Sequence, residues 1–294
     1  MTNKEIFDTI NAKILESLEN NIIPWKKPWN GGESMFPVNH ATKKHYQGIN
    51  TWLLLIDAEK MGYTSNQWIG FGQADKLGIK VNKGAKASTI YLWTSFDKEE
   101  TDDTGETTKR KIWYMKPLKV FNISSCSNVP TNYKPKEHNP IVECEKVIET
   151  YKTRENIQIT VTNSARAYYS ITSDSIIVPT KEQYESVEQY YSTMFHEISH
   201  STGAKNRLDR EFGLSFGNDA YAFEELVAEL SASYLCGINS IDNATIDNSA
   251  AYINGWKSKL KDNKEWFVKA ASKAQKASNF VLTGAKGMGG TENE

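Results

Sequence analysis

The chain has 294 residues, of which 39% are hydrophobic and 24% are charged, a composition typical of soluble globular proteins. Its length suits two domains of ordinary size. The net charge of -1 excludes a protein that imitates DNA, because an imitator needs dense negative charge.

The apolar runs, the cysteines and the charge distribution further limit the classes of protein to which the chain can belong. The sequence has no run of eighteen apolar residues and no apolar block at its N-terminus, so we expect a cytoplasmic protein that does not associate with a membrane. The three cysteines form no C-x-x-C pair, which indicates neither a disulfide framework nor a thiolate zinc site. Residues 1–125 carry 17 basic and 14 acidic residues, a net charge of +3, and the remainder carries 18 and 22, a net charge of -4.

The first half of the chain is expected to be α+β. Thr2 and Glu5 form a capping-box signature, and the apolar residues that follow at four-residue spacing predict an opening helix. Residues 97–106 hold six acidic residues and are expected to form a solvated loop. The other elements expected here are, in chain order, a helix near 49–61 and strands at 88–95 and 111–123.

A polar stretch with three prolines, residues 127–140, has the composition of a linker. We therefore expect an N-terminal domain over residues 1–130 and a mostly helical C-terminal domain over residues 131–294. The C-terminal elements are expected, in chain order, as a helix near 141–155, strands at 157–161 and 175–179, a helix from Thr180-x-x-Gln183 through His200, and helices near 221–236, 246–262 and 263–281.

The most informative motif is His196-Glu197-Ile198-Ser199-His200. Two imidazoles four residues apart lie on the same face of a helix, one turn apart, and can bind one ion. Glu197 beside the first histidine is placed to act as general base, taking a proton from a metal-bound water. A helix with two surface histidines and a salt-bridging glutamate would have the same local sequence, and this alternative stays open.

A third ligand is needed, because catalytic zinc sites usually take three protein ligands and leave the fourth position to water. Glu225 lies on a downstream helical pattern, and an acidic residue, Glu229, follows four positions later. This pair resembles the glutamate ligand and the supporting carboxylate of glutamate-type zincins. The predicted site is one Zn²⁺, or another divalent ion, held by His196, His200 and Glu225. Glu229 is expected to orient one histidine by accepting its ring N–H.

Aromatic and basic residues alternate in the first half, as they do on surfaces that bind single-stranded DNA. Bases stack on aromatic rings, and lysines follow the phosphates. Trp25 and Trp29 lie in a charged segment broken by prolines, which favours exposure, with packing of a loop as the alternative. The candidate DNA-binding residues are Trp25, Lys26, Lys27, Trp29, Lys43, Lys44, Tyr46, Lys83 and Lys86. The tryptophans in apolar runs, expected in the core, are Trp52, Trp68, Trp93 and Trp113.

Over nearly its whole length the chain resembles the ArdC antirestriction proteins encoded on conjugative plasmids. The first half is similar to the single-stranded-DNA-binding domain that this family shares with certain plasmid primases. Its matching segments are Ile23-Pro24-Trp25-x-x-Pro28-Trp29, Tyr46-x-Gly48-Ile49-Asn50, Asn66-x-Trp68-Ile69, Lys83-Gly84-x-Lys86 and Val120-Phe121-Asn122. The second half is similar to the family's zincin-like domain, through His196-Glu197-x-x-His200-x-Thr202-Gly203, Arg207-Leu208-x-Arg210 and Tyr221-Ala222-x-Glu224-Glu225-Leu226-x-Ala228-Glu229-Leu230.

The resemblance implies a protein that binds incoming single-stranded DNA and helps it escape restriction, with a metal centre whose substrate could be a protein linked to host restriction. Two alternatives remain. One is a cytoplasmic zinc metallopeptidase whose first half recruits substrate, and the other is a DNA-binding protector whose metal is structural. Replacing Glu197 with Gln should abolish function in the first case and preserve it in the second. The candidates for stabilising an oxyanion are Tyr168, Tyr169 and Tyr221.

Overall fold

The N-terminal half contains a four-stranded sheet with strand order β1-β2-β5-β4, in which only β1 and β2 are parallel. The computed structural model describes residues 2–25, 36–101, 107–130, 139–212, 219–241 and 250–286. The elements of this half are α1 (Asn3–Glu19), β1 (Val38–Asn39), α2 (Ile49–Met61), β2 (Gln67–Gly70), α3 (Phe71–Lys76), β3 (Lys80–Val81), β4 (Ser88–Thr101), β5 (Thr107–Asn122), the 3₁₀ turn η1 (Ile123–Ser125) and β6 (Cys126–Ser127).

Helix α1 begins as the sequence predicts. The Thr2 hydroxyl accepts a hydrogen bond from the Glu5 backbone N–H, and the Glu5 carboxylate accepts one from the Thr2 backbone N–H at 2.7 Å. The predicted apolar stripe, from Ile6 to Leu18, is buried. Helix α2 also matches its predicted range, and it ends where Gly62 takes the left-handed conformation with φ of 63°.

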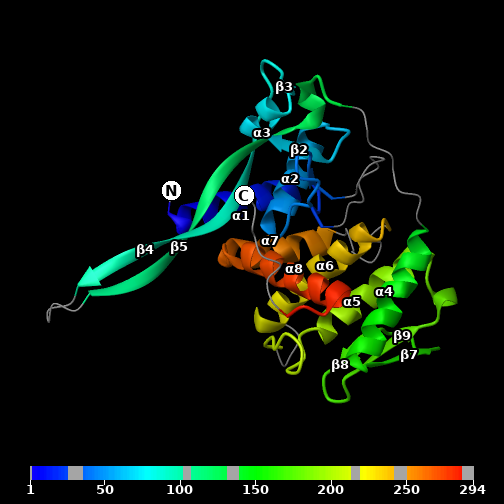
Figure 1. Cartoon of the computed structure of the whole chain (residues 1–294). Coiled ribbons are helices and arrows are strands. Elements are labelled where there is room, and N and C mark those ends of the chain that lie inside the picture. The colour runs from blue at the N-terminus through cyan, green and yellow to red at the C-terminus, as the bar shows by residue number, and fades with distance from the viewer. Residues whose placement is uncertain are drawn as a thin grey trace.

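Strands β4 and β5 are longer than predicted, with 14 and 16 residues, and β4 extends into the acidic stretch, residues 97–106, that was expected to be a loop. Opposite charges face each other across the two strands, as in the 3.0 Å ion pair between Lys109 and Glu99, and this pairing lets charged residues continue a strand. Since β2 pairs with β5 only at residues 120–122, most of this pair is a two-stranded ribbon. Figure 1 shows the ribbon extending away from the helices.

The C-terminal half places a three-stranded sheet, with strand order β7-β9-β8, beside a group of helices. Thr180 opens only a 3₁₀ turn, and Ser186 caps the metal-motif helix instead, so the predicted start of that helix is wrong. Strand β8 was not predicted. The elements are α4 (Pro140–Glu155), β7 (Gln158–Thr162), β8 (Tyr168–Ser170), β9 (Ser175–Pro179), the 3₁₀ turn η2 (Lys181–Gln183), α5 (Val187–Ser201), α6 (Asp219–Ile238), α7 (Ala250–Asp262) and α8 (Trp266–Thr283).

The structure describes only part of the predicted linker, residues 127–140. Its first residue, Ser127, belongs to β6, which pairs with β3, and Pro140 begins α4. Residues 131–138 lie outside the part of the chain that the structure describes.

The largest hydrophobic core joins the two halves of the chain. Apolar residues of α1 and α2 pack in one cluster with residues of α6, α7 and α8. A second cluster lies between α4, α5 and the C-terminal sheet. The helix that carries the metal motif is therefore packed from within its own half, while α6 also contacts the N-terminal half. Among the described residues, no helix is long and apolar enough to cross a membrane.

Candidate functional site

Helices α5 and α6 bring the three predicted metal ligands together. His196 and His200 lie one turn apart on α5, with their Nε2 atoms 3.0 Å from each other. Glu225 on α6 faces both rings, and its two carboxylate oxygens lie 3.5 Å from the Nε2 atoms of His196 and His200 respectively. The ligand-type atoms of the three residues all lie within 4.8 Å of one another.

These separations fit one divalent ion. Two ligands that lie about 2.0–2.1 Å from a tetrahedral ion are about 3.3–3.4 Å apart, close to the distances measured between these atoms. Two imidazole nitrogens and one carboxylate also form a donor set that zinc accepts in catalytic sites. The residues therefore fit a divalent metal.

The residues around Glu225 determine the protonation state of its carboxyl group. Burial raises the pKa of this carboxyl, but the hydrogen bond to His196 and the charges of both histidines lower it to about 2. Tyr221 donates a further hydrogen bond to Glu225. The carboxylate form, which binds a cation, is thus favoured.

Only one of the three tyrosines considered for oxyanion stabilisation contacts this centre. Tyr221 lies against Glu225, as described above. Tyr169 donates its hydroxyl proton to Asp174 at 2.8 Å, and Asp174 is also paired with Arg207. Tyr168 is exposed on strand β8. Of the three tyrosines, Tyr221 is therefore the one that lies at the candidate metal centre.

Sequence reasoning missed Glu224, which supports the second histidine. Its Oε1 lies 3.3 Å from Nδ1 of His200, and the side chain of Glu224 is only 6% exposed. A carboxylate at Nδ1 favours the tautomer that carries its proton there, so the lone pair of Nε2 points toward the proposed ion. Burial raises the pKa of Glu224, but hydrogen bonds from Arg210 and His200 lower it below its usual value.

Arg210 holds Glu224 in place. Its Nε and Nη2 donate to the two oxygens of Glu224 at 2.9 and 2.6 Å, and Nη2 also donates to the backbone oxygen of Ser199. A Cβ atom on Gly203 would lie 3.0 Å from Nη2 and 2.5 Å from the Phe212 ring, so a residue without a side chain is required there. The sequence did contain a signal for these supporting residues, because Arg210, Gly203 and Glu224 all lie within motifs that resemble the family.

Replacing Glu224 with Gln is expected to lower the affinity for a divalent ion about 10- to 100-fold, because the group that orients His200 loses its charge. Calorimetric titration of the metal-free protein with Mn²⁺ or Zn²⁺ measures this directly. Glu185→Gln, an exposed carboxylate just before α5, is the matched control and should bind as the unmodified protein does. Equal affinities in the two variants would show that Glu224 does not support the site.

Glu229 does not have the predicted partner. His200 turns its Nδ1 to Glu224, and among the described residues the hydrogen bonds to Glu229 come from the Trp25 indole N–H, at 3.0 Å, and the Tyr252 hydroxyl. The prediction that Glu229 orients a histidine by accepting its ring N–H is therefore wrong. Burial raises the pKa of Glu229 to about 7, although the hydrogen bond from Tyr252 opposes this.

Trp25 is buried, so the prediction that it offers an exposed ring for stacking is wrong. Only 1% of its surface is exposed. Its ring centroid lies 5.3 Å from that of Phe267 and 6.3 Å from that of Trp256, both in the C-terminal half. The neighbouring candidates Lys26, Lys27 and Trp29 lie outside the described residues.

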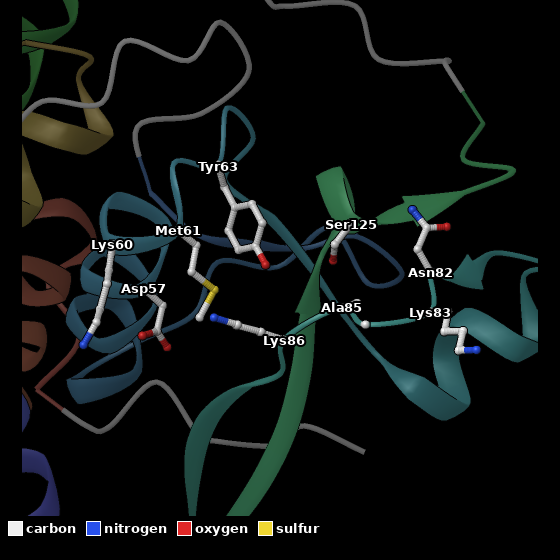
Figure 2. Close-up of a pocket in the computed structure, with 10 residues that line it drawn as sticks. Asp57, Lys60, Met61, Tyr63, Asn82, Lys83, Ala85, Lys86 and Ser125 are labelled. Carbon is white, nitrogen blue, oxygen red and sulfur yellow. The ribbon is translucent and has the colours of Figure 1, made fainter.

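Lys83 and Lys86 line a pocket of about 770 Å³ between the end of α2 and the loop before β4. Figure 2 shows Lys60 and Tyr63 from the α2 side and Lys83 and Lys86 from the loop. The one acidic lining residue, Asp57, forms a 2.7 Å ion pair with Lys13. The lining therefore has a surplus of positive charge.

The remaining candidates lie elsewhere in the N-terminal half. Lys43 and Lys44 are exposed on the turn after β1 and do not line this pocket. Tyr46 is half-buried, and its hydroxyl accepts a hydrogen bond from Asn39 at 3.2 Å. Burial raises its pKa to about 12. Tyr46 is thus packed against the sheet more than it is presented to solvent.

Of the four tryptophans expected in the core, two are buried and two are exposed. Trp52 and Trp68 are buried as predicted, at 1% and 0% exposure. Trp93 and Trp113 were expected in the core but are 41% and 56% exposed, because they lie on the projecting ribbon.

Comparison with known families defines the class of protein. A family model described as a zincin-like metallopeptidase matches residues 146–273, a range that contains all three candidate ligands. A second, described as the N-terminal domain of anti-restriction factor ArdC, matches residues 4–121. The protein therefore joins an α+β domain of ArdC type to a zincin-like domain.

Similarity to solved structures then identifies the family. Crystal structures of the antirestriction protein ArdC from plasmid R388, metal-free and Mn(II)-bound, are 34% and 32% identical, with TM-scores of 0.77 and 0.76. Each match covers 94% of this chain and 96% of the other. This chain belongs to the ArdC antirestriction family. The Mn(II)-bound relative and the zincin-like domain indicate a divalent metal at the centre described above.

Curated relatives have different lengths. Two Escherichia coli proteins named DNA primase TraC are 31% and 30% identical over 95% of this chain, which spans only 20% and 27% of their length. The uncharacterized protein y4eC of Sinorhizobium fredii (strain NBRC 101917 / NGR234) is 28% identical over 95% of this chain and 92% of its own.

Proposed function

We propose that this chain binds single-stranded DNA and protects incoming plasmid DNA from restriction in the recipient cytoplasm, with a zinc centre of metallopeptidase type. The observation that carries the proposal is the similarity to ArdC of plasmid R388 through both domains, over 94% of the chain. The basic pocket in the first domain and the ligand set in the second support it independently.

The pocket supports the DNA-binding half. Lys83 and Lys86 are both exposed on the loop before β4, where phosphates of an extended strand can reach them. Each phosphate neutralised by a lysine releases a counterion, so single-strand affinity should fall steeply as salt rises. Lys43 and Lys44 do not line this pocket, so we propose a secondary role for them.

Fluorescence anisotropy with a labelled oligonucleotide tests this half. The full chain should bind with a slope of log K against log salt near -0.7 for each phosphate contacted. Replacing both Lys83 and Lys86 by Ala should weaken binding and make the slope less negative by about 1.4. Lys76→Ala, an exposed lysine on α3 outside the pocket, is the control. Undetectable or salt-insensitive binding by the unmodified chain would refute DNA binding.

The second half of the proposal concerns the role of Glu197. A divalent ion held by His196, His200 and Glu225 would act as a Lewis acid and lower the pKa of a bound water. Glu197 follows His196 on α5 and is only 7% exposed. Its negative charge raises the pKa of both His196 and Tyr221. These observations support the proposal that Glu197 accepts a proton at this centre and delivers it to a leaving group.

Glu197→Gln separates a catalytic centre from a structural one. The change preserves the size of the side chain and removes the base, so hydrolysis should fall about 10²- to 10⁴-fold. We expect the variant to retain metal and DNA affinity but to lose protection of transferred DNA, measured as transfer efficiency into a restricting recipient. Full protection by the variant would assign the metal a structural role. Cleavage of protein substrates without any DNA affinity would favour a plain metallopeptidase.

A further inference from the structure

The β4–β5 ribbon carries an exposed surface that the metal centre and the basic pocket do not use. The two strands pair continuously from Ser88 and Val120 to Thr101 and Thr107. Because β2 pairs with only three residues of β5, no strand in the described part of the chain pairs with the outer part of the ribbon. Two-stranded ribbons are marginal in water unless one face is packed. Its exposed side chains therefore indicate what the ribbon contacts.

One face of the ribbon is balanced in charge. Side chains alternate between faces along a strand, and residues directly opposite share a face. Glu99 pairs with Lys109 at 3.0 Å, and Lys111 lies 5.9 Å from the ring centroid of Trp113, with Asp97 opposite Lys111. On the same face, Trp93 lies 6.5 Å from Phe7 of α1. Lys109 and Lys111 are thus offset by carboxylates, and Lys119 donates a hydrogen bond to the Thr89 hydroxyl at 2.6 Å.

The opposite face combines aromatic rings with cations. Phe96 and Tyr114 are 52% and 39% exposed, and their ring centroids lie 5.8 Å apart in an edge-to-face arrangement. Arg110 lies toward the tip of the ribbon from these rings, and Lys116 lies one step toward the base. We define the aromatic face by Phe96, Arg110, Ile112, Tyr114 and Lys116.

We propose that the aromatic face of the ribbon is a second contact surface for single-stranded DNA, an inference that rests on the proposed function. Exposed rings accept unpaired bases without sequence preference, and the flanking cations meet the phosphates. Duplex DNA keeps its bases stacked and cannot use such rings. An acidic strand with exposed bases is therefore the partner whose chemistry matches both parts of the surface.

Stacking and charge make different predictions for binding. Phe96→Ala with Tyr114→Ala removes stacking only, so the affinity of the full chain for a labelled oligothymidylate should fall about 5- to 150-fold per lost stack with an unchanged salt slope. Arg110→Ala removes one phosphate contact, so the salt slope should decrease by about 0.7. Both changes are at exposed positions and should leave the fold intact, which circular dichroism checks.

The balanced face supplies matched controls on the same strand. Trp113→Ala removes an exposed ring beside Tyr114, and Lys109→Ala removes a cation that Glu99 already neutralises, so neither should change affinity or slope. If the unmodified chain binds and the aromatic-face variants bind equally well, the inference is overturned and the proposed function stands. If those variants bind normally but no longer protect DNA in cells, the face contacts a protein and the inference is also overturned. Failure of the unmodified chain to bind removes the proposed DNA binding itself.

Discussion

Trp25→Ala is expected to lower the free energy of unfolding by about 3–5 kcal/mol, the usual cost of truncating a buried tryptophan. The ring fills space between α1 and helices of the C-terminal half, and its N–H satisfies Glu229. Truncation therefore leaves a cavity and also removes a donor from a buried carboxyl. Urea denaturation followed by circular dichroism measures the loss.

Trp25→Phe is the matched control, because it keeps an aromatic ring at this position and removes the indole N–H together with a smaller part of the ring volume than alanine does. Its stability should lie between those of the unmodified protein and Trp25→Ala. A Trp25→Ala variant that kept full stability but bound DNA weakly would contradict the buried position and return this ring to the surface. Otherwise any loss of DNA affinity in this variant reflects the fold.

Arg210→Ala is expected to destabilise the protein by about 3–5 kcal/mol, because it leaves the carboxylate of Glu224 buried without its partner. Arg210 and Glu224 are only 5% and 6% exposed, so water cannot replace the lost hydrogen bonds. The affinity for a divalent ion should fall as well, since Glu224 would no longer be held against His200.

A double-mutant cycle tests this coupling. Arg210→Ala combined with Glu224→Gln removes both charges, so it should cost less than the sum of the two single changes. Denaturation curves of the four proteins give the interaction energy. Additive losses would show that the two side chains do not stabilise each other.

Local patterns predicted much of the fold. The structure has the capping box of α1, the range of α2 and the strand at 175–179 as predicted. Each of these follows from the spacing of a few neighbouring residues. The convergence of His196, His200 and Glu225 was also predicted, because helical spacing brings the two histidines to one face.

Long-range packing could not be predicted. Trp25 looked exposed because its sequence neighbours are charged, but its burial depends on helices more than 200 residues away. Trp113 looked buried because its neighbours are apolar, but it lies on a projecting ribbon, where the described residues leave it exposed. The pairing of Arg210 with Glu224 likewise joins the segment after α5 to helix α6, and no local pattern gives the relative placement of the two.

Anomalous X-ray scattering from crystals soaked in Mn²⁺ or Zn²⁺ tests the metal centre most directly. We predict one peak about 2.0–2.3 Å from Nε2 of His196, Nε2 of His200 and the carboxylate of Glu225, and its loss in Glu225→Ala. An ion bound elsewhere, or no ion between these three side chains at saturating metal, would contradict the account.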